Sequence, residues 1–119
     1  MKLEVVEPKR IDDGKHEGVI TAVEERTKPY HYIDLILEFE GGKKIKAGYP
    51  LRKKENKATV SADSKFGKLL LDFGASLEVG TTIDTDTYLV GKECTFMTLT
   101  KTSERGMFAN VVPGSLKPK

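Results

Sequence analysis

Residues 30–40 show the strongest pattern in the chain, an alternation of side chains between an apolar face and a mostly polar one. A period of two is typical of a β-strand with one buried face. Gly41-Gly42 follows at once, which is a hairpin signature, and alternation resumes over residues 43–49. We therefore predict an antiparallel hairpin. The residues expected to point inward from its first strand are Ile33, Leu35, Leu37 and Phe39.

Three further strands are predicted from shorter signals. Residues 14–25 are rich in β-branched side chains without helical spacing, and Arg26-Thr27-Lys28-Pro29 ends them because proline cannot donate to a sheet. Residues 92–101 and 107–112 form the other two strands, joined by a short polar hairpin. Residues 117–119 are expected to be frayed.

One amphipathic helix is predicted between the third and fourth strands. Asp63 or Ser64 can cap its start, and Gly74 is well placed to end it. Its apolar residues fall at helical spacing. They are Phe66, Leu69, Leu70 and Phe73.

The segments on either side of this helix are less regular. Residues 52–63 have no periodicity, so we expect an exposed loop there. A second, shorter helical turn is expected up to Val90, with Asp84 or Asp86 as its cap and Gly91 closing it.

The order of the elements indicates the fold class. Three strands, a helix and two strands are the arrangement of a mainly β protein, a five-stranded OB-fold Greek-key barrel with one amphipathic helix between strands three and four. The chain has 119 residues, the usual size of one domain. We therefore predict a single OB-fold domain over residues 1–119, with its core in residues 14–113.

Positive charge is concentrated in one stretch of the chain. Residues 43–57 hold seven basic residues and the single acid Glu55, a balance of +6 in a chain whose net charge is +2. The remainder therefore carries −4. One positive region on an otherwise acidic body suits orientation on a polyanion, although a solvated loop rich in lysine would have the same composition.

In an OB fold, ligands lie across strands two and three, between the loop joining strands one and two and the loop joining four and five. Cations placed there can follow the phosphates of a single strand, and aromatic rings can stack on its bases at roughly 1–3 kcal/mol per base. The candidate nucleic-acid-binding residues are Arg26, Lys28, Tyr30, His31, Tyr32, Lys44, Lys46, Tyr49, Arg52, Lys53, Lys101, Arg105 and Phe108.

Several of these aromatic residues also have structural explanations. Tyrosines are good strand residues, so Tyr30 and Tyr32 can instead cover one end of a barrel. Tyr49 can close the core against the helix, and His31 can be a hydrogen-bonding loop residue or part of a stacking platform. Phe108 faces core or ligand depending on a strand register that the sequence leaves open.

No catalytic, metal or cofactor site is predicted. Asp84-Thr85-Asp86-Thr87 matches the Asp-x-Asp-x-Thr loop of aspartyl-phosphate phosphatases, but that loop needs a parallel strand in a larger α/β fold, and helix capping explains both aspartates. Two histidines and one cysteine supply neither the four ligands of a structural zinc site nor a set of nucleophile, base and orienting group.

The sequence also shows no pattern typical of a membrane span or a signal peptide. No apolar run approaches the roughly 18 residues that a membrane span needs. The lone Cys94 cannot form an internal disulfide, which agrees with a reducing compartment. A cytoplasmic protein without a membrane partner is therefore expected.

Four pieces of sequence carry a family resemblance. They are Gly18-Val19-Ile20-Thr21, the strand at 32–39, the helix at 66–74, and the ending that runs from Leu89-Val90-Gly91-Lys92-Glu93 to Val111-Val112-Pro113. Together, over residues 14–113, they resemble phage and prophage single-stranded-DNA-binding proteins of the OB superfamily. The resemblance implies a chain that coats exposed strands beside a recombinase, polymerase or helicase. Unlike many bacterial single-strand-binding proteins, the chain has no tryptophan and ends in Lys-Pro-Lys.

The leading hypothesis is therefore non-catalytic binding of single-stranded DNA with little sequence specificity, in replication, recombination or repair. Stacking and phosphate contacts do not read base edges, which is why little specificity is expected. Two alternatives stay open: a protein-interaction barrel within a larger assembly, and an RNA-binding OB domain. Replication or recombination proteins are possible partners, and a homodimer is a possible state.

Overall fold

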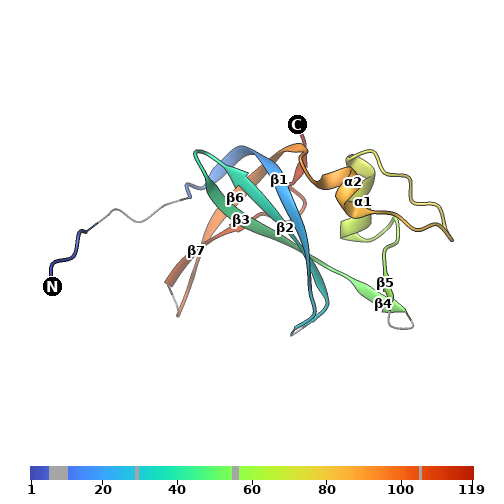
Figure 1. Cartoon of the computed structure of the whole chain (residues 1–119), viewed down its shortest axis with the longest axis horizontal. Coiled ribbons are helices and arrows are strands. Elements are labelled where there is room, and N and C mark those ends of the chain that lie inside the picture. Colours follow the sequence, from blue (N-terminus) through green and yellow to red (C-terminus); the bar gives the residue numbers. More distant parts are fainter. Residues whose placement is uncertain (6–10, 29, 55–56, 105) are drawn as a thin grey trace.

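The computed structural model describes residues 1–5, 11–28, 30–54, 57–104 and 106–119, and its main feature is an antiparallel sheet (Figure 1). In chain order the elements are β1 (Gly14–Arg26), β2 (Tyr32–Phe39), β3 (Lys43–Pro50), β4 (Arg52–Lys54), β5 (Lys57–Thr59), α1 (Lys65–Asp72), α2 (Thr85–Leu89), β6 (Glu93–Ser103), β7 (Gly106–Val111) and β8 (Lys117–Pro118). The prediction of a mainly β chain is confirmed.

The main sheet has the strand order β3-β2-β1-β6-β7, and β8 pairs with β6. β1 is central because residues 14–19 pair with β6 and residues 18–26 pair with β2. β3 and β7, at the two ends of this path, lie close to each other but form no ladder in the part of the chain that is described. The sheet therefore curves round without closing into a barrel.

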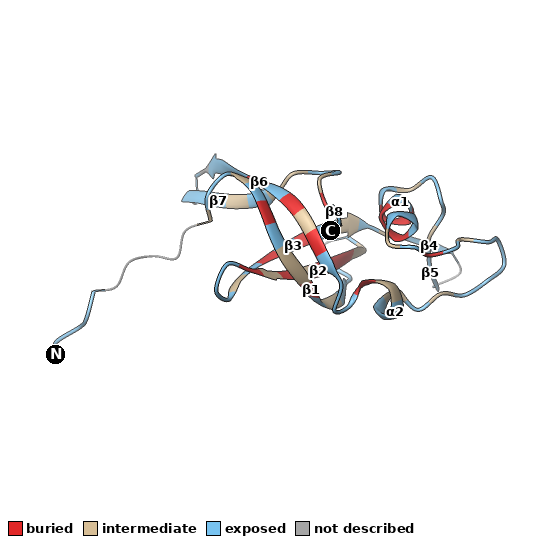
Figure 2. Cartoon of the chain, turned by 90° about the horizontal axis from the view of Figure 1, so that it is seen from above, coloured by how far each residue is buried: buried red, intermediate tan, exposed pale blue. Residues whose placement is uncertain are grey.

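The strand at residues 32–39 buries the side chains that its alternation predicted. Ile33, Leu35, Leu37 and Phe39 are all buried, and they pack with side chains of β1, β6 and α1. Figure 2 shows buried and exposed residues alternating along the strands and buried residues gathering on α1. The core thus lies inside the curve of the sheet, with α1 against it.

Both predicted helices form, with caps of the predicted kind. The Ser64 hydroxyl accepts a hydrogen bond from the Gly67 amide at 2.9 Å, and Gly74 follows α1 with a φ of +93°. Asp84 is the cap of α2, since its Oδ1 accepts from the Asp86 amide at 3.0 Å. Across the described residues, no helix is long and apolar enough to cross a membrane.

The prediction of an exposed loop over residues 52–63 is right about exposure but wrong about the loop, because two short exposed strands lie within residues 52–59. β4 and β5 pair antiparallel there, with Arg52 opposite Thr59 and Lys53 opposite Ala58. The Thr59 hydroxyl also donates to the Arg52 carbonyl at 3.2 Å. Strands of three residues are too short for alternation to reveal them, so the sequence showed only polarity.

The prediction that residues 117–119 fray is also wrong. Lys117 pairs with Thr95, the Lys119 amide donates to the Glu93 carbonyl at 3.2 Å, and Leu116 just before them is buried. A single apolar residue gives no periodic signal, which is why the sequence did not indicate this anchor.

Candidate functional site

The outer face of β2 and β3 carries three of the predicted ligand residues, namely Tyr32, Lys44 and Lys46. We use "outer face" for the side of these two strands that points away from the core. The cross-strand pairs on it are Tyr32 with Pro50, Asp34 with Gly48, Ile36 with Lys46, and Glu38 with Lys44. Lys44 and Lys46 are exposed on this face.

A cluster of three side chains stands at one end of the outer face. Arg26 of β1 donates from Nε to Asp34 Oδ2 at 3.0 Å and from its Nη2 to Asp34 Oδ1 at 3.4 Å. Its guanidinium carbon lies 4.6 Å from the centre of the Tyr32 ring. Arg26 was predicted to contact phosphate, but the structure engages it with a carboxylate and a ring, so it orients Tyr32 and covers one face of that ring.

Gly48 leaves the space in which this cluster fits. A Cβ added at Gly48 would lie 3.0 Å from Asp34 Oδ1 and 3.7 Å from an Arg26 nitrogen. Sequence reasoning did not identify Asp34 or Gly48. Asp34 is an acid on the polar side of its strand, and such an acid can pair with a basic residue of the neighbouring strand. Identifying which basic residue lies opposite requires the strand register, which the sequence leaves open.

The loop between β1 and β2 places its residues in two directions. Lys28 is exposed, and the Tyr30 residue is 71% exposed. His31 turns inward: its Nε2 lies 2.6 Å from Glu25 Oε1, and its carbonyl accepts from the Leu51 amide at 3.0 Å. Tyr30 is therefore free to meet a ligand, while His31 ties the loop to the end of β3.

Tyr49 lies on the inner side of β3. Its ring centre is 5.7 Å from that of Phe66 on α1, and burial raises the pKa of its phenol to about 12. It therefore closes the core against the helix, which was one of its two interpretations, and lies on the other side of β3 from Lys44 and Lys46.

The remaining predicted residues lie at two other places. Arg52 and Lys53 are exposed on β4. Lys101 and Phe108 are cross-strand partners on β6 and β7, and both are exposed. Arg105 lies outside the described residues. The β1–β2 and β6–β7 hairpins, whose loops were expected to flank a ligand, both point toward the lower side of Figure 1.

The exposed cations of this region are mostly unneutralised. Lys43 is paired, since its Nζ lies 3.2 Å from Glu40 Oε2, and Arg26 is held by Asp34. Within the described ranges, no ion pair involves the others. They are Lys28, Lys44, Lys46, Arg52, Lys53 and Lys101.

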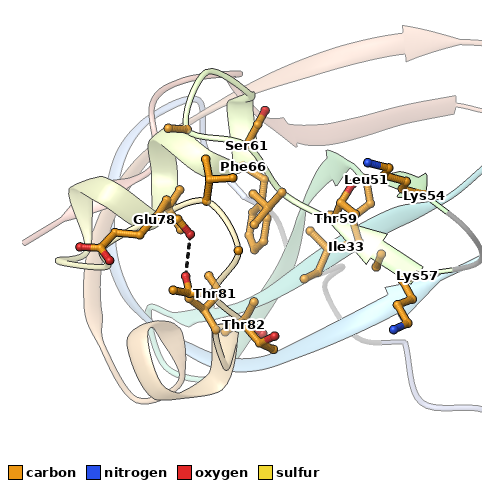
Figure 3. A pocket seen from close by; sticks show the side chains of 18 of the residues that line it. Ile33, Leu51, Lys54, Lys57, Thr59, Ser61, Phe66, Glu78, Thr81 and Thr82 are labelled. Atoms are coloured by element: carbon orange, nitrogen blue, oxygen red, sulfur yellow. Dashed lines mark hydrogen bonds between the residues drawn. The ribbon is translucent and has the colours of Figure 1, made fainter.

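A cleft that the sequence did not predict lies between β4–β5, α1 and the loop before α2. It has a volume of about 820 Å³ and apolar walls, with Ile33, Leu51 and Phe66 on them and Lys54 and Lys57 at one side (Figure 3). The Thr81 hydroxyl donates to the Glu78 carbonyl at 2.7 Å and shapes the opposite wall. Much of the cleft wall comes from the short strands β4 and β5 and from the loop before α2, which is why no sequence pattern indicated the cleft.

Comparison with protein-family models and with curated proteins finds no match for this chain. Within the described residues, no group of three or more His, Cys, Asp and Glu side chains could hold a metal ion. The outer face and its neighbouring loops are therefore the features of the chain that indicate a function.

Proposed function

We propose that this chain is a non-catalytic single-stranded-DNA-binding protein of the OB type, similar to those of phages and prophages, and that its outer face holds the strand. The strand order supports the OB part of the proposal. A meander of β3, β2 and β1 shares β1 with the β6–β7 hairpin, and α1 comes between the two groups in the chain.

One observation carries the binding part of the proposal: the Tyr32 ring, oriented by Arg26, shares the outer face with two exposed lysines that have no ion pair among the described residues. Tyr32 is half-buried beside the Arg26 guanidinium, so a base that stacks on the exposed part of this ring meets a ring that is already oriented. Lys44 and Lys46 stand on the neighbouring strand, where the phosphates of such a strand would pass.

The same geometry explains why little sequence specificity is expected. A ring presents a surface to the π-face of any base, and a lysine contacts a phosphate that every nucleotide has. Base stacking contributes roughly 1–3 kcal/mol per base, so Tyr32 with the exposed Tyr30 supplies the non-ionic part of the affinity.

The test is a titration of a labelled oligothymidine of about 20 nucleotides, followed by fluorescence anisotropy at low and moderate salt. We expect binding that falls steeply with salt and that duplex DNA does not displace. Tyr32→Ala and the pair Lys44→Ala/Lys46→Ala should weaken it, while Lys92→Ala, an exposed lysine outside the outer face, should not. No binding at low salt would overturn the proposal, and preference for oligouridine would redirect it to RNA.

A protein-interaction role is the second candidate, and one observation favours it. Met97, Leu99 and Phe108 are about half exposed on β6 and β7, with residue exposures of 48%, 52% and 51%. Apolar side chains of this size beside an edge strand are typical of contact surfaces. A partner in replication or recombination, or a second copy of the chain, would then bind at β7. Sedimentation at rising concentration tests the second copy, since a monomer at all concentrations would exclude it.

A further inference from the structure

A basic groove runs along the edge of β3, between that strand and β7, where the described sheet does not close into a barrel. Its walls are the edge of β3, the exposed side of α1, and residues 110–117, and its volume is about 670 Å³. It lies where β3 and β7 approach without pairing. We use "seam groove" for this feature.

The lining of the seam groove is strongly positive. Four lysines face it against one carboxylate, that of Asp72. The lysines are Lys46, Lys65, Lys68 and Lys117. All four are exposed, and no ion pair involves any of them in the part of the chain that is described.

The two lysines of α1 give the strongest evidence that the seam groove binds an anionic ligand. Lys65 and Lys68 are three residues apart, so they stand side by side on one face of the helix. Neighbouring like charges on a helix cost a few tenths of a kcal/mol, and a bound polyanion reverses the sign of that term. By contrast, Lys43 and Lys119 elsewhere in the structure each have a carboxylate partner at 3.2 Å.

The seam groove is continuous with the outer face. Tyr32 and Lys46 belong to the outer face through their strand positions, and both also line the groove. A strand stacked on Tyr32 therefore enters the groove beside Lys46, and the Asp34 carboxylate next to Tyr32 is buried and engaged with Arg26.

We infer that bound single-stranded DNA passes from the outer face into the seam groove, where Lys65, Lys68 and Lys117 contact its phosphates. This inference rests on the proposed function, because it extends the same binding track by a second segment. It assigns to α1 and to the C-terminal residues a ligand role that the sequence did not indicate.

The test is the double variant Lys65→Ala/Lys68→Ala with the same oligothymidine of about 20 nucleotides. Alanine is a strong helix former, so α1 should persist, and circular dichroism checks this. Each lost phosphate contact lowers the slope of log affinity against log salt by about 0.7 for a single strand, so two lost contacts lower it by about 1.4. At about 0.1 M salt this corresponds to a loss of about 25-fold, which should vanish toward 1 M.

The matched control is Lys15→Ala/Lys92→Ala, which removes the same charge from exposed positions outside the seam groove. It should leave the salt slope unchanged. If wild type binds and the Lys65/Lys68 variant keeps the wild-type slope and affinity, the inference is overturned while the proposed function stands. An equal loss in the control would also overturn it, because the effect would then come from net charge alone. Absence of wild-type binding at low salt would instead overturn the proposed function.

Discussion

Arg26→Ala is the change whose effect on stability the structure predicts most sharply. Arg26 was expected to be a surface cation, and removal of such a residue changes stability by no more than about 0.5 kcal/mol. In the structure, however, its partner Asp34 has a side chain only 8% exposed, while the Arg26 side chain is 45% exposed. The substitution therefore leaves a nearly buried carboxylate without the cation that pairs with it.

The magnitude follows from the burial of the two partners. Breaking a fully buried pair costs about 3–5 kcal/mol, whereas an exposed pair contributes about 0–1 kcal/mol. Because one partner is buried and the other half exposed, we expect Arg26→Ala to lower the free energy of unfolding by about 2 kcal/mol. With an m-value of roughly 2 kcal/mol/M, the urea midpoint should fall by about 1 M.

The assay is urea unfolding of the variants in a double-mutant cycle. Arg26→Ala, Asp34→Ala and the double variant should show a coupling of about 1–2 kcal/mol, because the double variant no longer buries an unpaired charge. Arg52→Ala is the matched control, an exposed arginine on β4 without an ion pair in the described residues, and should cost no more than about 0.5 kcal/mol. If Arg26→Ala costs as little as Arg52→Ala, the cluster does not exist as described.

Three titratable groups give further predictions. Burial raises the pKa of the Cys94 thiol to about 11, so a thiol reagent at about pH 8 should react far more slowly with the native chain than with the urea-unfolded chain, and equal rates would contradict this burial. Burial also raises the pKa of Tyr49 from 10.0 to about 12, so the fold disfavours the phenolate and stability should decline as the pH rises above 10.0. Urea unfolding above and below that pH should show a smaller decline for Tyr49→Phe. Hydrogen bonding to His16 holds the pKa of Glu40 below its usual 4.5, so the contribution of its carboxylate is present at neutral pH and lost as the pH falls below 4.5. The stability difference between wild type and Glu40→Gln should therefore shrink in acid, and a constant difference would refute this.

The long elements of the fold could be predicted because local pattern and final pairing agree in them. Alternation over residues 30–49 indicated the same hairpin that the register of β2 and β3 shows, and Gly41 and Gly42 both have a positive φ at its turn. β4, β5 and β8 could not be predicted, because each has three residues or fewer and a period needs more.

The sequence indicated which kinds of residue the candidate site contains, but not how those residues are placed relative to one another. Period two already places Tyr49 on the same face as Ile45 and Ala47, so its inward position could have been deduced from the sequence. The contact of Arg26 with Asp34 and Tyr32 needs the register between β1 and β2. The exposure of Phe108 likewise needs its pairing with Lys101, which no local pattern determines.

Lysines along an edge strand also have a purely structural explanation, because lysine is the charged residue that protects sheet edges most often. A charged edge prevents the pairing of sheets from different molecules, and a carboxylate or an ammonium group can do this. Every charged residue of β3, namely Lys43, Lys44 and Lys46, is basic, and so is every charged residue of β4 and β5. β1, which is paired on both sides, carries acids and bases together. Edge protection accounts for lysines on β3 but not for Lys65 and Lys68 on α1, so the basic residues taken together fit the proposed polyanionic ligand better than edge protection alone.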